Sequence, residues 1–134
     1  MPIEYLIDRE RRLVSARGHG TLTEEDLWKY QEEVWSRAEL AGFNELMDMS
    51  DVARIVSPSV ERLKALAEKS AGMDTASSSR LAIIAPAPLA YGLGRMYETY
   101  RGMDARSTKQ VGVFRARDRA LEYLGRSAPK NKDG

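Results

Sequence analysis

Short apolar segments alternate along this chain with longer stretches in which apolar residues recur at helical spacing. The apolar segments predict five strands, over residues 3–8, 13–20, 45–49, 81–86 and 111–114. The stretches between and after them predict four helices. The resulting order, β-β-α-β-α-β-α-β-α, favours an α/β domain with a mostly parallel sheet.

The predicted strands differ in how they should pair. The first two are joined by a short polar turn at residues 9–11, so they must run antiparallel. Residues 81–86 (Leu-Ala-Ile-Ile-Ala-Pro) are continuously apolar, which is typical of a strand that is buried on both faces. We therefore expect a five-stranded mixed sheet that begins with a β-hairpin and continues with parallel strands covered by helices.

The first predicted helix begins at Thr23. Its hydroxyl can cap the free amides, and acidic side chains at residues 24–26 favour the positive end of the helix dipole. The apolar face is formed by Leu27, Tyr30, Val34, Ala38 and Ala41. We expect this helix to continue until Gly42.

Proline positions mark the beginning of the next two helices. Ser57 as N-cap and Pro58 at the first helical position predict the second helix, which Gly72 ends. Pro88 begins the third helix. Residues 117–124 form the fourth.

Length and composition fit a single domain. The 134 residues are 43% hydrophobic and 31% charged, which is typical of a folded globular chain. We assign the domain to residues 1–125 and a disordered polar tail to residues 126–134. The net charge of +1 is too small for a domain that grips nucleic-acid phosphates, so no nucleic acid is expected as a partner.

The chain contains no cysteine, which excludes disulfides and thiolate metal sites and fits a reducing compartment. No apolar run approaches the ~20 residues that a membrane-spanning helix needs. The N-terminus lacks the basic start and long apolar stretch of a signal peptide. We therefore expect a cytoplasmic protein without a transmembrane segment.

Side chains that could support catalysis are sparse. His19 is the sole histidine, whereas metal sites and catalytic triads need several convergent groups. The glycine pairs Gly18/Gly20 and Gly92/Gly94 do not complete a dinucleotide-binding fingerprint. We expect no catalytic residue, no metal and no cofactor, and hence no enzyme.

Polar residues near the end of the third predicted strand mark a candidate cleft. Open α/β sheets bind ligands at the carboxyl ends of their strands, where Asp48, Ser50 and Asp51 are expected. Tyr91, on the third predicted helix, is the aromatic candidate for the same cleft. The alternative is that Asp48 and Ser50 only cap local turns.

Trp28 and Trp35 are seven residues apart, which places both on one stripe of the first predicted helix. Exposed aromatics at helical spacing can mark an interface, and on this basis we expect self-association as a homodimer. The alternative is that the core-facing side of this helix is simply wide.

Two stretches carry a resemblance to a known fold family. The first is residues 46–60, Leu-Met-Asp-Met-Ser-Asp-Val-Ala-Arg-Ile-Val-Ser-Pro-Ser-Val. The second is residues 81–97, in which a strand ends in Pro-Ala-Pro and Tyr-Gly-Leu-Gly-Arg-Met-Tyr follows. Over about residues 3–125 the chain resembles the SpoIIAA-like branch of the STAS superfamily, the fold of bacterial anti-sigma-factor antagonists. That branch is similar in fold to CRAL-TRIO lipid-binding domains.

The resemblance implies a STAS-like fold and phosphorylation as a means of control. In the antagonists an Asp-x-Ser, matched here by Asp48 and Ser50, is followed by Asp-Ser-Ser-Gly, in which the second Ser is phosphorylated. Pro58 stands at that position in this chain, so the candidate phosphorylation sites are its neighbours Ser57 and Ser59. The alternative is that Ser57 is only an N-cap.

Together these features favour a non-catalytic protein-interaction or regulatory domain that binds a protein partner or a second copy of itself. The alternative is a small-molecule or lipid-binding module that uses the cleft near Asp48 and Tyr91. Its support is the apolar, tyrosine-containing segment 85–100 and the similarity of the fold to lipid carriers.

Overall fold

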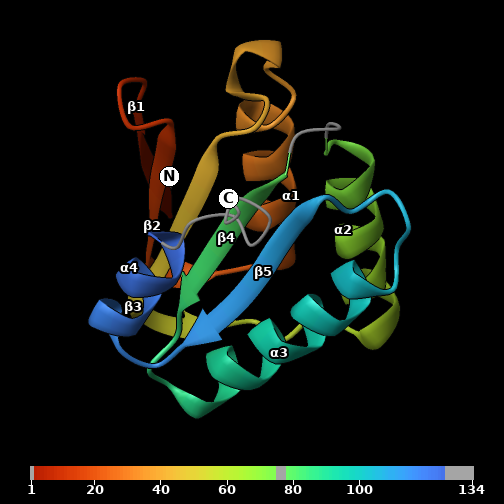
Figure 1. Cartoon of the computed structure of the whole chain (residues 1–134). Helices are drawn as coiled ribbons and strands as arrows, with labels where there is room; N and C mark the ends of the chain where they lie inside the picture. Colours follow the sequence, from red (N-terminus) through yellow and green to blue (C-terminus); the bar gives the residue numbers. More distant parts are fainter. Residues whose placement is uncertain (1, 75–77, 126–134) are drawn as a thin grey trace.

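A five-stranded mixed sheet forms the centre of the computed structural model, which describes residues 2–74 and 78–125 (Figure 1). The strands are β1 (Ile3–Asp8), β2 (Leu13–Leu22), β3 (Asn44–Ile55), β4 (Ser79–Ile84) and β5 (Lys109–Phe114). They lie in the sheet in sequence order, with β1 antiparallel to β2 and the following pairs parallel. The predicted hairpin and mixed sheet are thereby confirmed.

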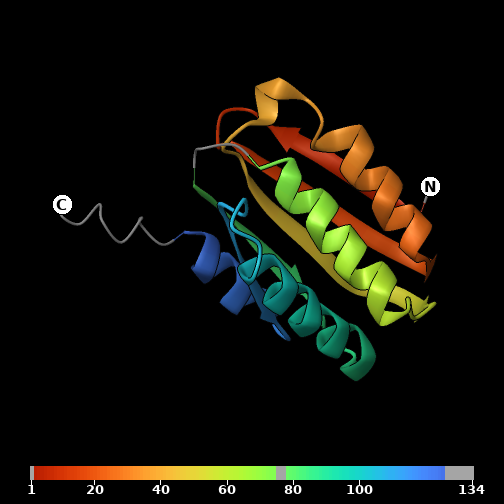
Figure 2. The same ribbon diagram turned by 90° about the vertical axis from the view of Figure 1, so that its right-hand side faces the viewer.

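Three helices cover one face of the sheet and a fourth lies on the other (Figure 2). The first three are α1 (Glu24–Val34), α2 (Val60–Gly72) and α3 (Pro88–Gly102), and the fourth is α4 (Arg117–Leu124). Each of the first three connects two neighbouring parallel strands. Right-handed crossovers that always advance one strand in the same direction place their helices on the same face.

The sheet therefore separates two hydrophobic cores of unequal size, and β4 contributes to both. Leu81 and Ile83 belong to the larger core under the three helices, whereas Ala82 and Ile84 belong to the smaller core under α4. All four side chains are buried. This confirms the interpretation of the continuous apolar run as a strand covered on both faces.

The first helix is shorter than predicted. It begins as expected, because Thr23 and Asp26 form a capping box, but it ends at Val34 instead of Gly42. The carbonyl of Glu33 near its end accepts a hydrogen bond from the Arg37 side chain, and a short 3-10 turn at Ala38–Leu40 then buries Leu40. The prediction failed because the apolar residues after Val34 continue helical spacing without belonging to a helix.

The second helix also begins later than predicted. Ser59, not Ser57, is its N-cap, and the Ser59 hydroxyl accepts a hydrogen bond from the backbone amide of Arg62 at 3.2 Å. Pro58 lies in the preceding connection and is not the first helical residue. The predicted beginnings at Pro88 for α3 and at Arg117 for α4 are confirmed.

The third strand extends six residues beyond its predicted end at Met49. Residues 45–48 pair with β4 on one side and β2 on the other, whereas residues 51–55 pair with β2 alone. The far ends of β2 and β3 thus form a two-stranded parallel ribbon, which we call the overhang (β2 residues 19–22 and β3 residues 51–55).

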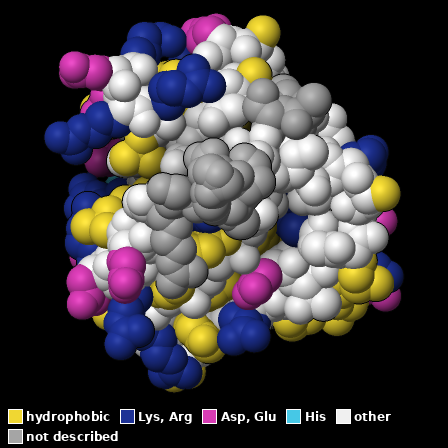
Figure 3. All heavy atoms as spheres, in the orientation of Figure 1, with side chains coloured by type: hydrophobic (Ala, Val, Ile, Leu, Met, Phe, Trp, Pro, Cys, Tyr) yellow, Lys and Arg dark blue, Asp and Glu magenta, His cyan; other side chains and the backbone are white. Residues whose placement is uncertain are grey.

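Surface charges of both signs are mixed. On the face shown in Figure 3, Lys and Arg side chains lie among Asp and Glu side chains, consistent with the net charge of +1. Within the described ranges no helix is long and apolar enough to cross a membrane. The predicted tail at residues 126–134 lies outside the described residues.

Candidate functional site

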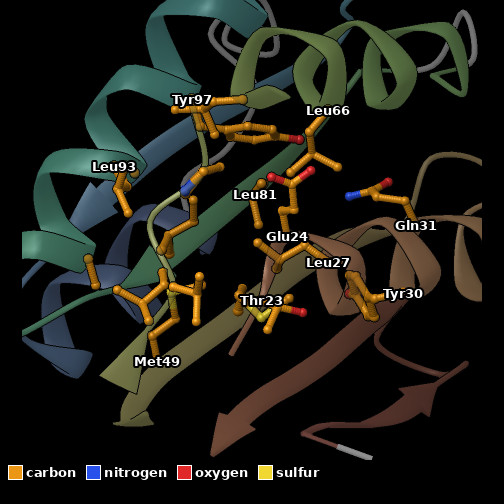
Figure 4. A pocket seen from close by; sticks show the side chains of 18 of the residues that line it. Thr23, Glu24, Leu27, Tyr30, Gln31, Met49, Leu66, Leu81, Leu93 and Tyr97 are labelled. Atoms are coloured by element: carbon orange, nitrogen blue, oxygen red, sulfur yellow. The ribbon is translucent and has the colours of Figure 1, made fainter. Parts of the chain in front are cut away.

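An apolar pocket of about 80 Å³ lies between the sheet and the three helices α1, α2 and α3, on the face of the sheet that carries the larger core (Figure 4). Every layer around it contributes apolar side chains. These include Leu27 of α1, Met47 and Met49 of β3, Leu66 of α2, Leu81 of β4 and Leu93 of α3. The pocket is neither sealed nor a shallow surface depression.

Two small residues of α3, Ala90 and Gly94, form one wall of the pocket. A Cβ atom added at Gly94 would lie 3.0 Å from Cγ1 of Val113, so glycine at this position permits α3 to approach β5 closely. Ala90 is buried but short. The local sequence thus holds the helix near the sheet while leaving space beside it.

The lining residues with solvent exposure lie at the carboxyl ends of the parallel strands. Val56 is exposed, and Thr23, Glu24 and Pro58 are half-buried. Glu24 at the beginning of α1 pairs with Arg62 of α2, which joins the two helices beside this opening. Ligands of open α/β sheets bind at this end of the strands.

Two residues of the lining, Tyr30 and Glu45, belong to a buried network that also includes Lys109, which does not itself line the pocket. Lys109 Nζ lies 3.2 Å from Oε1 of Glu45, and the phenol of Tyr30 donates a hydrogen bond of 2.7 Å to Oε2. The Lys109 and Glu45 side chains are only 8% and 2% exposed. The ammonium group also lies 3.2 Å from the centre of the Trp35 ring.

Burial changes the protonation of this group of residues. Burial, reinforced by the charge and hydrogen bond of Glu45, raises the pKa of Tyr30 well above its ordinary value of 10.0. Burial lowers the pKa of Lys109 from 10.5, and the charge of Glu45 opposes that change. Sequence reasoning missed the pair, although one acid beside the apolar Leu46 and Met47 was a signal that a partner must exist.

A second buried ion pair fixes Tyr97, another lining residue. Arg101 Nη2 lies 2.6 Å from the Asp74 carboxylate, and Arg101 Nη1 donates a hydrogen bond of 2.8 Å to the Tyr97 hydroxyl. The backbone amides of Thr108 and Lys109 also donate to Asp74. The Tyr97 ring is therefore held in place at the α3 side of the pocket.

Gln31 differs from the other polar residues of the lining. It is 9% exposed, and no side-chain hydrogen bond joins it to another described residue, but its amide atoms are not among the fully buried ones that lack a partner, which are Nε2 of His19 and Oγ of Ser70. The other polar lining side chains have partners. These pairs are Thr23 with Asp26, Glu24 with Arg62, Tyr30 with Glu45, Glu45 with Lys109, and Tyr97 with Arg101. Figure 4 shows the Gln31 amide directed from α1 toward the other lining side chains.

The four residues predicted to form a cleft do not line this pocket. Asp48 lies on the α4 side of the sheet, where it accepts hydrogen bonds from the Ser50 backbone amide at 2.9 Å and from Arg117 at 3.0 Å. These bonds agree with the alternative interpretation of Asp48 as a local cap. Asp51 pairs with Arg17 at 2.8 Å.

Tyr91 is half-buried on α3, and the guanidinium carbon of Arg115 lies over its ring, 4.4 Å from the ring centre. Its hydroxyl accepts a hydrogen bond from Arg95. The side chain packs against the large core from outside the pocket lining.

The two tryptophans of the predicted interface are half-buried and contact their own chain. The Trp28 ring lies beside Arg62 and Lys69 of α2, with the cations at 5.1 and 4.9 Å from its centre. Trp35 covers Lys109. Both pack against the large core, as the alternative of a wide core-facing side expected, and their role in self-association stays a prediction.

The remaining candidates lie around the overhang and its connection to α2. Ser57 is exposed, Ser59 caps α2, and phosphorylation of either stays a prediction. His19 Nε2 lies 3.4 Å from a carboxylate oxygen of Glu4. Across residues 2–74 and 78–125 there is no group of three or more His, Cys, Asp or Glu side chains that could hold a metal ion.

Comparison with known proteins identifies the fold. No protein-family model matches the sequence, and no curated protein matches it. A solved structure from Shewanella loihica PV-4, an uncharacterised protein of the DUF3478 family with a SpoIIAA-like fold, is similar over 91% of this chain and 93% of its own. The sequence identity is 21% and the TM-score is 0.56. The chain therefore has a SpoIIAA-like fold, as the resemblance predicted.

Proposed function

We propose that this SpoIIAA-like domain is a non-catalytic binding protein whose pocket takes a small, mostly apolar molecule. The observation that carries the proposal is the pocket itself, which is apolar and opens at the carboxyl ends of the parallel strands. Asp48 and Tyr91 do not line this pocket, and the cleft expected near them stays a prediction.

The state of the polar lining residues supports binding over catalysis. General acids and bases work best with pKa values near the operating pH, whereas burial moves the pKa of Tyr30 further from neutrality. Glu45 is occupied by Tyr30 and Lys109, and Glu24 is occupied by Arg62. Because both carboxylates already have partners that join elements of the fold, neither is free to act as a general base.

The size of the pocket limits the buried part of the ligand. An engineered apolar cavity of about 150 Å³ binds benzene, so a volume of about 80 Å³ fits a shorter or narrower group. Each buried CH₂ group contributes about 0.8 kcal/mol, and association itself costs free energy, so a short alkyl group that fits only in part should bind weakly. Longer ligands would extend through the opening beside Val56 and Pro58.

The proposal is tested by filling the pocket. Pentan-1-ol is titrated into the protein, and its binding is followed by the backbone amide NMR signals of Leu66 and Leu81. We expect Ala90→Leu to weaken binding more than about tenfold and to stabilise the free chain by about 0.5–2 kcal/mol, because the added carbons occupy the cavity. Ala90→Val, which adds less volume, should have a smaller effect.

Ala87→Leu is the matched control, because it adds the same atoms at an exposed position just before the same helix. It should bind pentan-1-ol as the unmodified protein does. Equal binding by the Ala90→Leu and Ala87→Leu variants would contradict the proposal. Native mass spectrometry of protein purified from its own host then tests whether a natural ligand accompanies it.

A protein-interaction or regulatory domain that self-associates is the second candidate function. The observation that favours it is the free edge of β1, beside which Leu6 is 76% exposed. An edge strand offers unpaired backbone groups that a second copy of the same strand can match. Sedimentation equilibrium should show a dimer, and a strict monomer at high concentration would contradict this candidate.

A further inference from the structure

The strand β1 lies at an edge of the sheet and has one side free for pairing (Figure 1). The backbone amide of His19 on β2 donates a hydrogen bond of 2.8 Å to the carbonyl of Pro2. Backbone groups of successive residues in an antiparallel strand alternate in direction, so the even-numbered residues of β1 turn theirs toward β2. The amides and carbonyls of Ile3, Tyr5 and Ile7 therefore point outward from the edge.

The side chains of β1 also offer surface that a partner can cover. Tyr5 and Ile7 pack against the larger core on one face of the sheet. Leu6 lies on the opposite face and is 76% exposed, because the smaller core under α4 is centred on β3 and β4. A strand placed beside β1 would remove part of the Leu6 side chain from water and satisfy the outward backbone groups.

The acidic residues of β1 restrict how a second copy can pair with it. Two strands related by a two-fold axis run antiparallel, and each possible register is centred on one residue. A register centred on Leu6 or on any later residue of β1 sets two acidic side chains opposite each other, as does one centred on Glu4. Like charges directly opposite are destabilising. A register centred on Ile3 pairs only the beginning of the strand, which leaves Tyr5 as the favoured centre.

We propose that two copies of this chain pair through β1 in the register centred on Tyr5, which joins the five strands of each copy into one continuous sheet. This inference rests on self-association, the second candidate function, and is independent of the pocket. In this register Tyr5 faces Tyr5, and Ile3 faces Ile7 of the second copy. The outward amides and carbonyls then meet one another, which allows about six hydrogen bonds between the copies.

The same register suits the side chains on both faces of the joined sheet. Leu6 of each copy lies opposite Glu4 of the other and diagonally beside the second Leu6, so the two leucines cover each other at the two-fold axis. The Glu4 carboxylate keeps a counter-charge in its own chain, since Arg17 Nη2 lies 3.3 Å from it. On the other face the two Tyr5 rings form a cross-strand aromatic pair.

Charge variants at Leu6 test the register by sedimentation equilibrium. Leu6→Glu faces Glu4 of the second copy and should raise the Kd of the dimer at least about tenfold. Leu6→Lys faces the same carboxylate and should form a dimer about tenfold tighter than that of Leu6→Glu. Met103→Glu is the matched control, because Met103 is 74% exposed just after α3, and it should leave the Kd unchanged.

Cross-linking reports on the register directly, because the chain contains no cysteine. Glu4 and Leu6 of the second copy form a non-hydrogen-bonded pair, whose Cα atoms lie about 4.5 Å apart, within the range of a disulfide. Mild oxidation of mixed Glu4→Cys and Leu6→Cys chains should therefore give a covalent heterodimer. Leu6→Cys alone should cross-link poorly, since the diagonal separation of about 7–8 Å is too long.

The outcomes separate this inference from self-association itself. A strict monomer at high concentration would overturn both. A dimer in which Leu6→Cys cross-links by itself, and the mixed chains do not, would overturn the register alone. Equal dimer affinities for Leu6→Glu and Leu6→Lys, or for Leu6→Glu and Met103→Glu, would also overturn it, because the charge of Glu4 would then not face residue 6.

Discussion

At the scale of single residues, the charged side chains of the pocket lining are satisfied within the chain. Glu45 is almost completely buried and has a partner on each carboxylate oxygen. Glu24 pairs with Arg62. A buried carboxylate with partners on both oxygens holds the elements that it joins, so its removal should be measured as a loss of stability.

Removing one member of the buried ion pair should be strongly destabilising. Lys109→Met leaves the Glu45 carboxylate buried without its counter-charge, and we expect a loss of about 3–5 kcal/mol in the free energy of unfolding, measured in urea. The double variant Glu45→Gln/Lys109→Met keeps an acceptor for Tyr30 and removes both charges. It should be more stable than Lys109→Met alone.

Lys29→Met is the control for this prediction. Lys29 pairs with Glu25, both side chains are exposed, and surface ion pairs contribute about 0–1 kcal/mol. A Lys109→Met protein no less stable than the Lys29→Met protein would show that the Glu45 charge is not confined to a dry interior.

At the scale of elements, the β3–α2 connection shows how local signals compete. Ser57 with Pro58 and Ser59 alone are both plausible helix beginnings in sequence. The structure uses Ser59, because β3 continues to Ile55 and leaves residues 56–59 to reach α2. Ser59 then supplies the side-chain oxygen for the first turn.

This assignment predicts different effects for two serines that lie two residues apart. Ser59→Ala should lower the free energy of unfolding by about 1 kcal/mol, the usual value of an N-cap. Ser57→Ala, at an exposed position without a cap hydrogen bond, should change it by less than about 0.5 kcal/mol. Thermal or urea unfolding of both variants is sufficient, and the reverse order would place the helix beginning at Ser57.

Sequence patterns revealed most of the fold because they are local. The apolar run in β4, the capping box at Thr23 and Pro88 at the start of α3 each act within a few residues. The extension of β3 was missed, because its polar residues are strand only through pairing with β2. The pocket was missed for a similar reason, since its shape depends on side chains that meet from five separate elements.

At the scale of the whole molecule, buried titratable groups couple the fold to alkaline pH. Burial raises the pKa of Tyr30 and of Tyr97 above 10.0, so the folded chain keeps phenol protons that the unfolded chain releases. That stability is present below pH ~10 and is lost as pH rises through the raised values. Lys109, whose pKa is lowered from 10.5, acts in the opposite direction.

The hydrogen bond with Glu33 raises the pKa of Tyr5 in the same way, so three tyrosines are opposed by one lysine, and we expect the free energy of unfolding to fall above pH ~10. Tyr30→Phe should flatten this fall by up to about 1.4 kcal/mol per pH unit, although it lowers stability at pH 7 by removing a hydrogen bond to Glu45. Urea unfolding between pH 8 and 11 measures both effects. Tyr100→Phe, at a half-buried position on α3, is the control, and equal slopes for the two variants would contradict the prediction.

The overhang of β2 and β3 borders the pocket and is held by fewer strand pairings than the core. Residues 51–55 of β3 have a neighbouring strand on one side only, and Ile55 and Val56 belong to the pocket lining. Fewer cross-strand bonds make this stretch cheaper to open locally than the three-stranded region behind it. We therefore expect a ligand of the proposed kind to enter and leave through local opening of this stretch, while the two cores remain closed.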